Sequence, residues 1–339
     1  MKERPKFEVR KGRSAAGAAE HRHAGIRALI PRALLLIAFS GFAAASASAQ
    51  VALLIERGAS TYQQAAQGFR NALSPPVEVT QIEIDESGRL PGNALEQLQR
   101  NRARLVIAIG TRAARAANER LPNIPMLYCL TLRPLENQLV GMNIGGIVLD
   151  VELPQQFENA RKVLPNLRRI ATVYDELTSG ALVRRSRRYL GTDISLLTRN
   201  ARTPREASRE IRDLFDNVLG PGDAFWLLWD SVTANPANFR MLVELSLKTK
   251  VPLIVPARPF VEAGALVSIG ANYEDAGRQL ARMAQRVLSG EAHAGDFVAV
   301  PPAELTITIN GEVARKLGVP IPPGLRADIL APLAGMGAP

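Results

Sequence analysis

Acidic and hydroxyl side chains, rather than histidines or cysteines, provide most of the chemistry open to this sequence. His21 and His23 lie near the N-terminus, only His293 lies further along, and Cys129 is the single cysteine. A Ser–His–Asp triad or a zinc site therefore has too few residues, and one cysteine cannot form an internal disulfide. The sequence also lacks a G-x-x-x-x-G-K loop and a G-x-G-x-x-G turn after a strand. We expect no enzymatic activity, no catalytic residues, no cofactor and no metal ion.

Carboxylates at the ends of two predicted strands are the first candidates for polar contacts. Asp175 and Glu176 follow one strand, and Asp230 follows another that carries Trp226 and Trp229. Paired carboxylates can perform acid–base catalysis. A carboxylate beside a tryptophan can instead hold the ammonium group of a ligand. Asp230 can equally cap a helix beside a core tryptophan. Because no nucleophile accompanies these acids, we favour ligand contacts over catalysis.

Thr111 and Arg112 offer a site of opposite charge. They follow the apolar segment 105–109, where a helix is expected to begin. A helix N-terminus carries partial positive charge and attracts a carboxylate, and Arg112 could add a bidentate contact. The alternative is that Thr111 only caps the helix and Arg112 points to solvent.

Strand-like and helix-like segments alternate along the chain. Apolar or alternating segments predict strands at 51–55, 77–84, 105–109, 126–129, 169–174, 193–197, 224–229, 252–255 and 265–269. Helical periodicity predicts helices at 61–73, 92–102, 111–120, 153–164, 179–189, 204–218, 236–249 and 273–288. This alternation is typical of the α/β class, with parallel sheets covered on both faces. The two runs 51–145 and 152–270 are each the size of a compact domain.

The strand-to-helix loops predict where a ligand would bind. In open α/β sheets, ligands lie outside the carboxyl ends of the strands, and two facing lobes would line a cleft from both sides. The candidate ligand-binding residues are Ser60, Thr61, Tyr62, Thr111, Arg112, Thr131, Asp175, Thr178, Trp229, Asp230, Ser231 and Arg258.

The N-terminal segment is typical of an export signal. A basic leader ends at Arg32, an uncharged and mostly apolar run covers 33–45, and Ala47-Ser48-Ala49 follows. The apolar run is shorter than the ~20 residues that span a bilayer. We predict cleavage after Ala49, so that residues 1–49 are a signal peptide and the protein is periplasmic. An uncleaved membrane anchor is the alternative.

The net charge of +10 comes largely from this leader. Nine of the 42 basic and three of the 32 acidic side chains lie in residues 1–49, which leaves +4 for the remainder. The other arginines are scattered rather than gathered in a stripe, so we expect no nucleic-acid partner.

Several segments together resemble one known family. They are Gly68-Phe69, Gly110-Thr111-Arg112-Ala113-Ala114, Leu153-Pro154-Gln155-Gln156, 260–266 (FVEAGAL), Tyr273 with Gly277-Arg278-Gln279, and Ile309-Asn310. The sequence thereby resembles the substrate-binding proteins of ABC transporters, in the family that includes binders of tryptophan and other aromatic amino acids. The resemblance covers nearly all of residues 51–330.

This resemblance implies the type I periplasmic-binding-protein fold, with two Rossmann-like lobes joined by three crossovers. Residues 51–147 and 265–297 would form the N-terminal lobe, 148–264 and 298–330 the C-terminal lobe, and 331–339 a tail. Hinge points are expected near Gly145-Gly146, Gly264 and 298–301.

The chain departs from the family pattern at three ligand loops. Thr131-Leu132-Arg133-Pro134 stands in place of Thr-Asp-Pro, and Trp229-Asp230-Ser231-Val232 keeps only the Asp of Thr-Asp-Asn-Thr. Ala257-Arg258 replaces Ser-Glu. An added arginine and a missing glutamate favour a more anionic ligand, so an aromatic amino acid does not follow from the resemblance.

We expect a non-enzymatic receptor that binds a small amino-acid-like solute or small carboxylate and closes around it. The resemblance implies an ABC permease with a cytoplasmic ATPase as partner. One alternative is a ligand sensor that acts on a membrane histidine kinase. Less favoured alternatives are an exported enzyme using Asp175, Glu176 or Asp230, and a repressor core of the same fold.

Overall fold

The computed structural model describes residues 49–58, 60–74, 77–85, 87–191 and 193–330. The expected signal peptide, apart from Ala49, and the expected tail 331–339 lie outside the described residues. Within the described residues, no helix has both the length and the apolar character needed to cross a membrane.

The first half of the chain forms a parallel sheet with the strand order β2-β1-β3-β4-β5. Its strands are β1 (Ala49–Glu56), β2 (Val77–Ile84), β3 (Leu105–Ile109), β4 (Met126–Thr131) and β5 (Ile144–Val148). The central strand β3 and its neighbour β1 are largely apolar because both of their faces are buried under helices.

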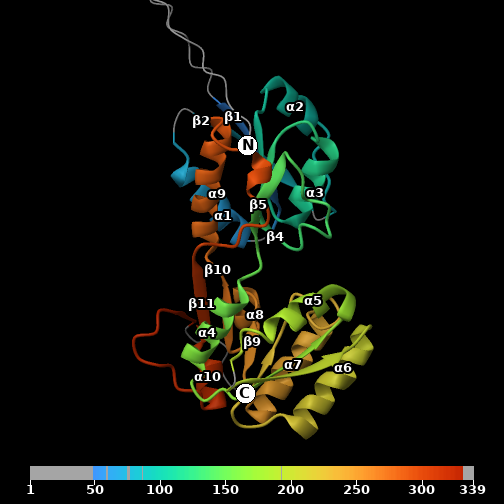
Figure 1. Ribbon diagram of the computed structural model, residues 1–339, viewed down its shortest axis with the longest axis vertical. Helices are drawn as coiled ribbons and strands as arrows, with labels where there is room; N and C mark the ends of the chain where they lie inside the picture. The colour runs from blue at the N-terminus through green and yellow to red at the C-terminus, as the bar shows by residue number, and fades with distance from the viewer. Residues whose placement is uncertain (1–48, 59, 75–76, 86, 192, 331–339) are drawn as a thin grey trace, which may run out of the picture. The chain divides into compact units, whose positions relative to one another are not determined.

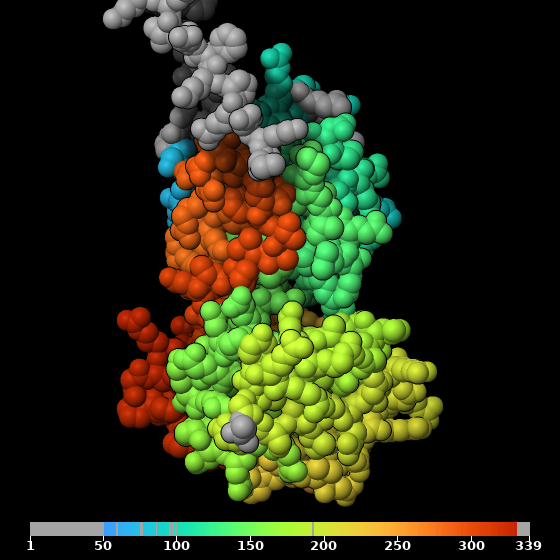
Figure 2. Space-filling model, viewed as in Figure 1, coloured from blue at the N-terminus to red at the C-terminus, as the bar shows by residue number. Residues whose placement is uncertain are grey.

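Four helices cover this first sheet (Figure 1). They are α1 (Ser60–Ala72), α2 (Ala94–Arg100), α3 (Thr111–Arg120) and α9 (Tyr273–Leu288). The helices α1 and α9 pack on one face, and α2 and α3 pack on the other. Figure 2 shows α9, in orange, at the surface of this part of the molecule.

Two glycines allow α1 and α9 to pack with their backbones in contact. A Cβ on Gly68 would lie 2.0 Å from the carbonyl oxygen of Glu274, and one on Gly277 would lie 2.0 Å from that of Ala65. These distances are far below van der Waals contact, so the pair requires glycine at both positions.

The second sheet has the strand order β12-β11-β10-β9-β8-β6-β7. Its strands are β6 (Arg169–Tyr174), β7 (Ser195–Asn200), β8 (Asp223–Trp226), β9 (Leu253–Val255), β10 (Val267–Ala271), β11 (Leu305–Asn310) and β12 (Asp328–Leu330). The β10–β11 pair is antiparallel and the other pairs are parallel.

Helices cover both faces of the second sheet as well (Figure 1). One face carries α4 (Leu153–Val163), α5 (Glu176–Ser186) and α10 (Gly311–Leu317). The other carries α6 (Pro204–Asp213) with the π-helical turn Leu214–Val218, α7 (Pro236–Thr249) and α8 (Arg258–Glu262). Thr203 is the N-cap of α6, since its hydroxyl accepts a hydrogen bond from Glu206 N at 3.2 Å.

The chain passes between the sheets at three places. It leaves the first sheet after β5 and returns between β10 and α9. The last passage follows the 3₁₀ turn Ala294–Asp296: the segment 297–300 pairs with β5, and Val300 N donates to Gly146 O at 2.9 Å. Tyr128 holds the same segment, because its hydroxyl accepts from Ala299 N at 3.2 Å.

Residues 265–297 were expected in the first lobe, and β10 within that range pairs with β9 and β11 in the second sheet. The expected hinge glycines also have packing roles. Gly146 lies inside β5, where a Cβ would meet Tyr128 O at 2.1 Å. Gly264, at φ 114°, lies in the turn that joins α8 to β10. Both elements belong to the second sheet and its helices, so this turn does not pass between the two sheets.

Candidate functional site

The carboxyl end of β1 places a carboxylate at the N-terminus of α3. Glu56 Oε1 accepts a hydrogen bond from Arg112 N at 2.6 Å, and Glu56 Oε2 accepts from Arg112 Nη1 at 3.3 Å. Glu56 is buried, while the Arg112 side chain is largely exposed. The sequence predicted that a ligand carboxylate would bind this helix terminus, but the chain's own carboxylate occupies it.

Gly110 allows this arrangement. It is the N-cap of α3 at φ 100°, and a Cβ there would lie 2.4 Å from Glu56 Oε1. The prediction that Thr111 caps the helix is therefore wrong. Thr111 is the first residue of α3, and its hydroxyl accepts from Leu132 N at 3.0 Å. The neighbouring Tyr62 is half-buried, and burial together with the nearby Glu56 charge raises the pKa of its phenol to about 12.

Asp230 ties the ends of β6 and β8 together. Its Oδ2 accepts from Asp175 N at 3.0 Å, Thr178 Oγ1 at 3.0 Å and Ser179 Oγ at 2.7 Å. Its Oδ1 accepts from Val232 N at 3.0 Å. The side chain is 1% exposed. Asp230 is thus better described as a structural residue than as the partner of a ligand ammonium group. Its carboxylate oxygens already accept hydrogen bonds from the protein.

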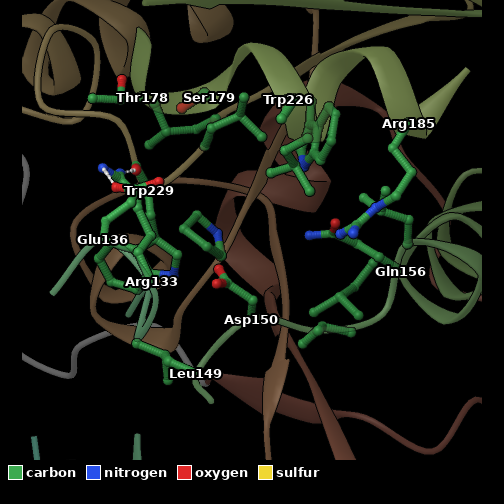
Figure 3. Close-up of a pocket in the computed structure, with 18 residues that line it drawn as sticks. Arg133, Glu136, Leu149, Asp150, Gln156, Thr178, Ser179, Arg185, Trp226 and Trp229 are labelled. Carbon is green, nitrogen blue, oxygen red and sulfur yellow. Dashed lines mark hydrogen bonds and ion pairs between the residues drawn. The ribbon is translucent and has the colours of Figure 1, made fainter. Parts of the chain in front are cut away.

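A cavity of about 240 Å³ opens beside α4, α5 and the end of β8 (Figure 3). Its apolar wall consists of Leu149, Val151, Leu153, Ala181, Leu182, Trp226, Leu227, Leu228, Trp229, Pro256 and Ile269. Its polar lining consists of Arg133, Glu136, Asp150, Gln156, Thr178, Ser179 and Arg185. A mostly apolar cavity with a few convergent polar groups is the usual form of a small-molecule site.

Three side chains present hydrogen-bond donors to this cavity, and one of these donors is buried without a partner among the described residues. Trp226 is only 1% exposed, and its indole Nε1 is buried without a hydrogen-bond partner. The Gln156 amide is also buried, and Figure 3 shows it and the Arg185 guanidinium extending into the cavity from α4 and α5. A buried donor without a partner costs about 1–3 kcal/mol, so a ligand acceptor would satisfy a real need here.

Asp150 lies across the cavity from these donors (Figure 3). Burial raises the pKa of its carboxyl, while Arg133 and Arg185 lower it and Glu136 raises it. Arg133 donates to the carbonyl oxygen of Trp229 and pairs with Glu136 at 3.5 Å. The cavity therefore offers a carboxylate acceptor from the segment after β5 and donors from α4, α5 and β8.

Only Thr178 and Trp229 of the predicted ligand residues line this cavity. Trp229 also packs edge-on against Phe260, with ring centroids 5.5 Å apart. Asp175 caps α5 by accepting from Leu177 N at 3.3 Å. Ser60 and Thr61 begin α1, and Ser231 is exposed in a turn.

Two other predicted residues lie at further positions. The Thr131 hydroxyl is buried at the end of β4 without a partner. Arg258 pairs with Glu262 at 2.8 Å and with Asp328 at 3.3 Å, at a second cavity described below.

Sequence reasoning missed the most polar part of the cavity lining. The sequence did contain an indication for Arg133, because this residue lies in a loop that departs from the family pattern. Asp150 and Arg185 had none: one lies in a crossover and the other in an arginine-rich helix that resembles a solvated face. Among the described residues, no group of three or more His, Cys, Asp and Glu could hold a metal ion.

The comparison with family models assigns the chain. Residues 60–328 match the model for the ABC transporter substrate binding protein family. The chain belongs to this family of solute-binding proteins. A comparison with curated protein sequences finds no match.

Solved structures with the same fold include substrate-binding proteins. One, from Streptococcus pneumonia, was solved in complex with L-Trp; identity is 21%, the match covers 84% of this chain and 100% of that one, and the TM-score is 0.60. Another is a ligand-free, open substrate-binding protein with adhesive properties from Clostridium difficile, at 18% identity, 83% and 99% coverage and a TM-score of 0.66. The fold is that of the type I periplasmic binding proteins, as the resemblance implied.

Proposed function

We propose that this protein is the extracytoplasmic solute-binding component of an ABC transporter, and that it binds a small zwitterionic solute in the cavity beside Trp226. The unpartnered indole N–H of Trp226 is the observation that carries this proposal, because it is a buried donor aligned with an accessible cavity. The L-Trp bound to the pneumococcal protein supports an amino-acid-like class of solute.

Each end of the proposed solute has chemically suitable partners. Arg185, Gln156 and Trp226 supply N–H donors for a carboxylate, and a charge-assisted bond to a guanidinium is stronger than a neutral one. Asp150 supplies an acceptor for an ammonium group, and Trp229 supplies an aromatic wall. The roles expected for the other candidate residues remain predictions.

We further propose that ligand binding selects a closed arrangement of two lobes. One lobe would comprise residues 51–148 and 272–297, and the other would comprise 149–271 and 301–330. This division follows the sheet membership of β10 and the packing of α9 on α1. Arg133 follows β4 and bonds the Trp229 carbonyl after β8, so it is suited to couple cavity occupancy to closure.

Export and transport complete the proposal. Residues 1–49 would be removed on export to the periplasm, and the closed form would dock on a permease driven by a cytoplasmic ATPase. Family membership supports this partnership. A sensor that acts on a histidine kinase would bind solute in the same way, so reconstitution with the permease separates the two.

Calorimetric titration of the purified protein with amino acids and small carboxylates tests the binding site. Arg185→Ala should abolish binding, and Trp226→Phe should weaken it about tenfold through loss of one N–H donor. Arg184→Ala is the matched control, because Arg184 is the exposed neighbour that pairs with Glu176 outside the cavity. Equal affinity in Arg185→Ala and Arg184→Ala would refute the site, and conversion of the bound solute would refute a receptor function.

A further inference from the structure

A second cavity, of about 140 Å³, lies on the opposite face of the second sheet. Side chains alternate between faces along a strand. In β10, Ile269 lines the cavity beside Trp226, whereas Ser268 and Gly270 line the second cavity. The two cavities share no lining residue.

The floor of this second cavity is a patch of hydroxyl groups set by strand register. Ser268 lies opposite Thr308 and Gly270 lies opposite Thr306 in the β10–β11 pair. Thr308 also lies beside Asp328 of β12. Ser268 is 2% exposed and Thr308 is 1% exposed.

Ser268 and Thr308 both line the cavity, and neither hydroxyl oxygen belongs to the fully buried atoms that lack a partner. Each hydroxyl can donate one bond and accept two, so either can bond water or a ligand in the cavity. A hydroxyl pair that faces a cavity on two neighbouring strands is therefore a preformed polar surface.

The charges at the rim exclude an anionic occupant. Arg258 is the one cation in the cavity lining, and two carboxylates, Glu262 and Asp328, already neutralise it. Glu274 also lines the cavity, and its carboxylate pairs with Arg278 at 2.8 Å. A ligand anion would thus meet no uncompensated positive charge. The remaining rim consists of the neutral side chains of Gln64, Asn272, Tyr273 and Thr306.

The size of the cavity favours a small organic molecule over a single water. One water molecule needs about 10–15 Å³ of cavity volume. The cavity of about 140 Å³ therefore accommodates a solute of several non-hydrogen atoms. A molecule whose own hydroxyls alternate donor and acceptor would match Ser268, Thr306 and Thr308 on adjacent strands. Because Gly270 has no side chain, such a molecule can approach the β10 backbone between them.

We propose that this hydroxyl-lined cavity is a second ligand site, which takes a small neutral polyol. The site is independent of the solute cavity beside Trp226. It can be occupied while that cavity is empty, since the two cavities share no lining residue and Ile269 faces only the cavity beside Trp226.

Titration of the protein with erythritol tests this proposal directly, with binding measured by ligand-observed NMR. Thermal shifts are unsuitable because excluded polyols stabilise any protein. The wild type should show saturable binding, and Ser268→Ala and Thr308→Val should each weaken it about fivefold to tenfold through loss of one hydroxyl contact. Thr172→Val is the matched control, because the Thr172 hydroxyl is buried and unpartnered but lines neither cavity.

The possible outcomes separate this site from the other. Non-saturable erythritol binding, or equal weakening in Thr172→Val, would overturn the second site. Saturable binding of acetate that Ser268→Ala removes would overturn the polyol class. Arg185→Ala should leave erythritol affinity unchanged; if it abolishes erythritol binding, the two cavities are not independent and the proposal fails.

Discussion

Replacement of Asp230 should destabilise the protein strongly, rather than simply remove a ligand contact. Asp230 accepts four hydrogen bonds: three join the start of α5 to the loop after β8, and the fourth, from Val232 N, lies within that loop. Asp230→Ala removes the acceptor of Asp175 N, Ser179 Oγ and Val232 N, and at least the Ser179 hydroxyl and Val232 N–H are buried. The Thr178 hydroxyl keeps Asp175 as an acceptor.

The magnitude follows from the number and burial of these bonds. Hydrogen bonds to a charged group contribute about 1.5–3 kcal/mol each, and an abandoned buried donor costs about 1–3 kcal/mol. Water can reach the half-buried Thr178 and Asp175 positions and offset part of the loss. We therefore expect Asp230→Ala to lose about 3–5 kcal/mol of unfolding free energy, which places it in the severe range for one substitution.

Urea unfolding, followed by circular dichroism and tryptophan fluorescence, measures this loss. Asp175→Ala is the control: it removes an N-cap from the same loop and should cost about 1 kcal/mol. A loss below about 1 kcal/mol for Asp230→Ala would refute the assignment of Asp230 as a structural tie. Its carboxylate would then be free for the ligand contact that the sequence suggested.

Two further substitutions test packing and protonation. Gly277→Ala should destabilise the α1–α9 pair by about 1–3 kcal/mol, because its Cβ would overlap the Ala65 carbonyl. Gly92→Ala is the control and should be nearly neutral, because a Cβ there has no atom within 4 Å. Equal unfolding midpoints for these two variants would contradict the close packing of α1 on α9. Asp150→Asn should stabilise the unliganded protein more at pH 7 than at pH 4. Burial raises the pKa of Asp150 above 3.8 in the folded state, so the wild type loses stability as the pH rises through that pKa. The neutral asparagine does not ionise and avoids this loss. A stability difference between wild type and Asp150→Asn that does not change with pH would show that this carboxyl is not desolvated.

The alternation of elements was enough to predict the α/β class, and the resemblance supplied the particular fold. Buried parallel strands such as β3 read as short apolar runs, and most helices had a clear apolar face. The strand β5 escaped prediction because its Gly145-Gly146 pair suggested a hinge. Those glycines are needed for close packing: a Cβ on Gly145 would meet Ala294 O at 2.1 Å. Such a contact lies between segments 149 residues apart, which local sequence does not encode.

The candidate site was harder to predict than the fold because its polar groups come from places without a motif. Thr178 and Trp229 followed from the rule that ligands bind at strand ends. Gln156 and Arg185 instead project from one face of α4 and α5, and their importance depends on the absence of partners in three dimensions. Asp230 and Thr111 satisfied the strand-end rule, but their hydrogen-bonding capacity is used within the protein.

The position of Glu56 explains why the anionic end of a solute should bind near the second sheet. The N-terminus of α3 is the obvious anion site of the first sheet, yet Glu56 already neutralises its partial positive charge and bonds Arg112. A second carboxylate brought to that point would be repelled by Glu56. The Arg185 guanidinium, together with the unpartnered Trp226 N–H, is thus the position that we propose for a solute carboxylate. The added arginine that suggested an anionic ligand was Arg258, whose charge is compensated, so the anion recognition that we propose rests on Arg185, which the sequence pattern did not single out.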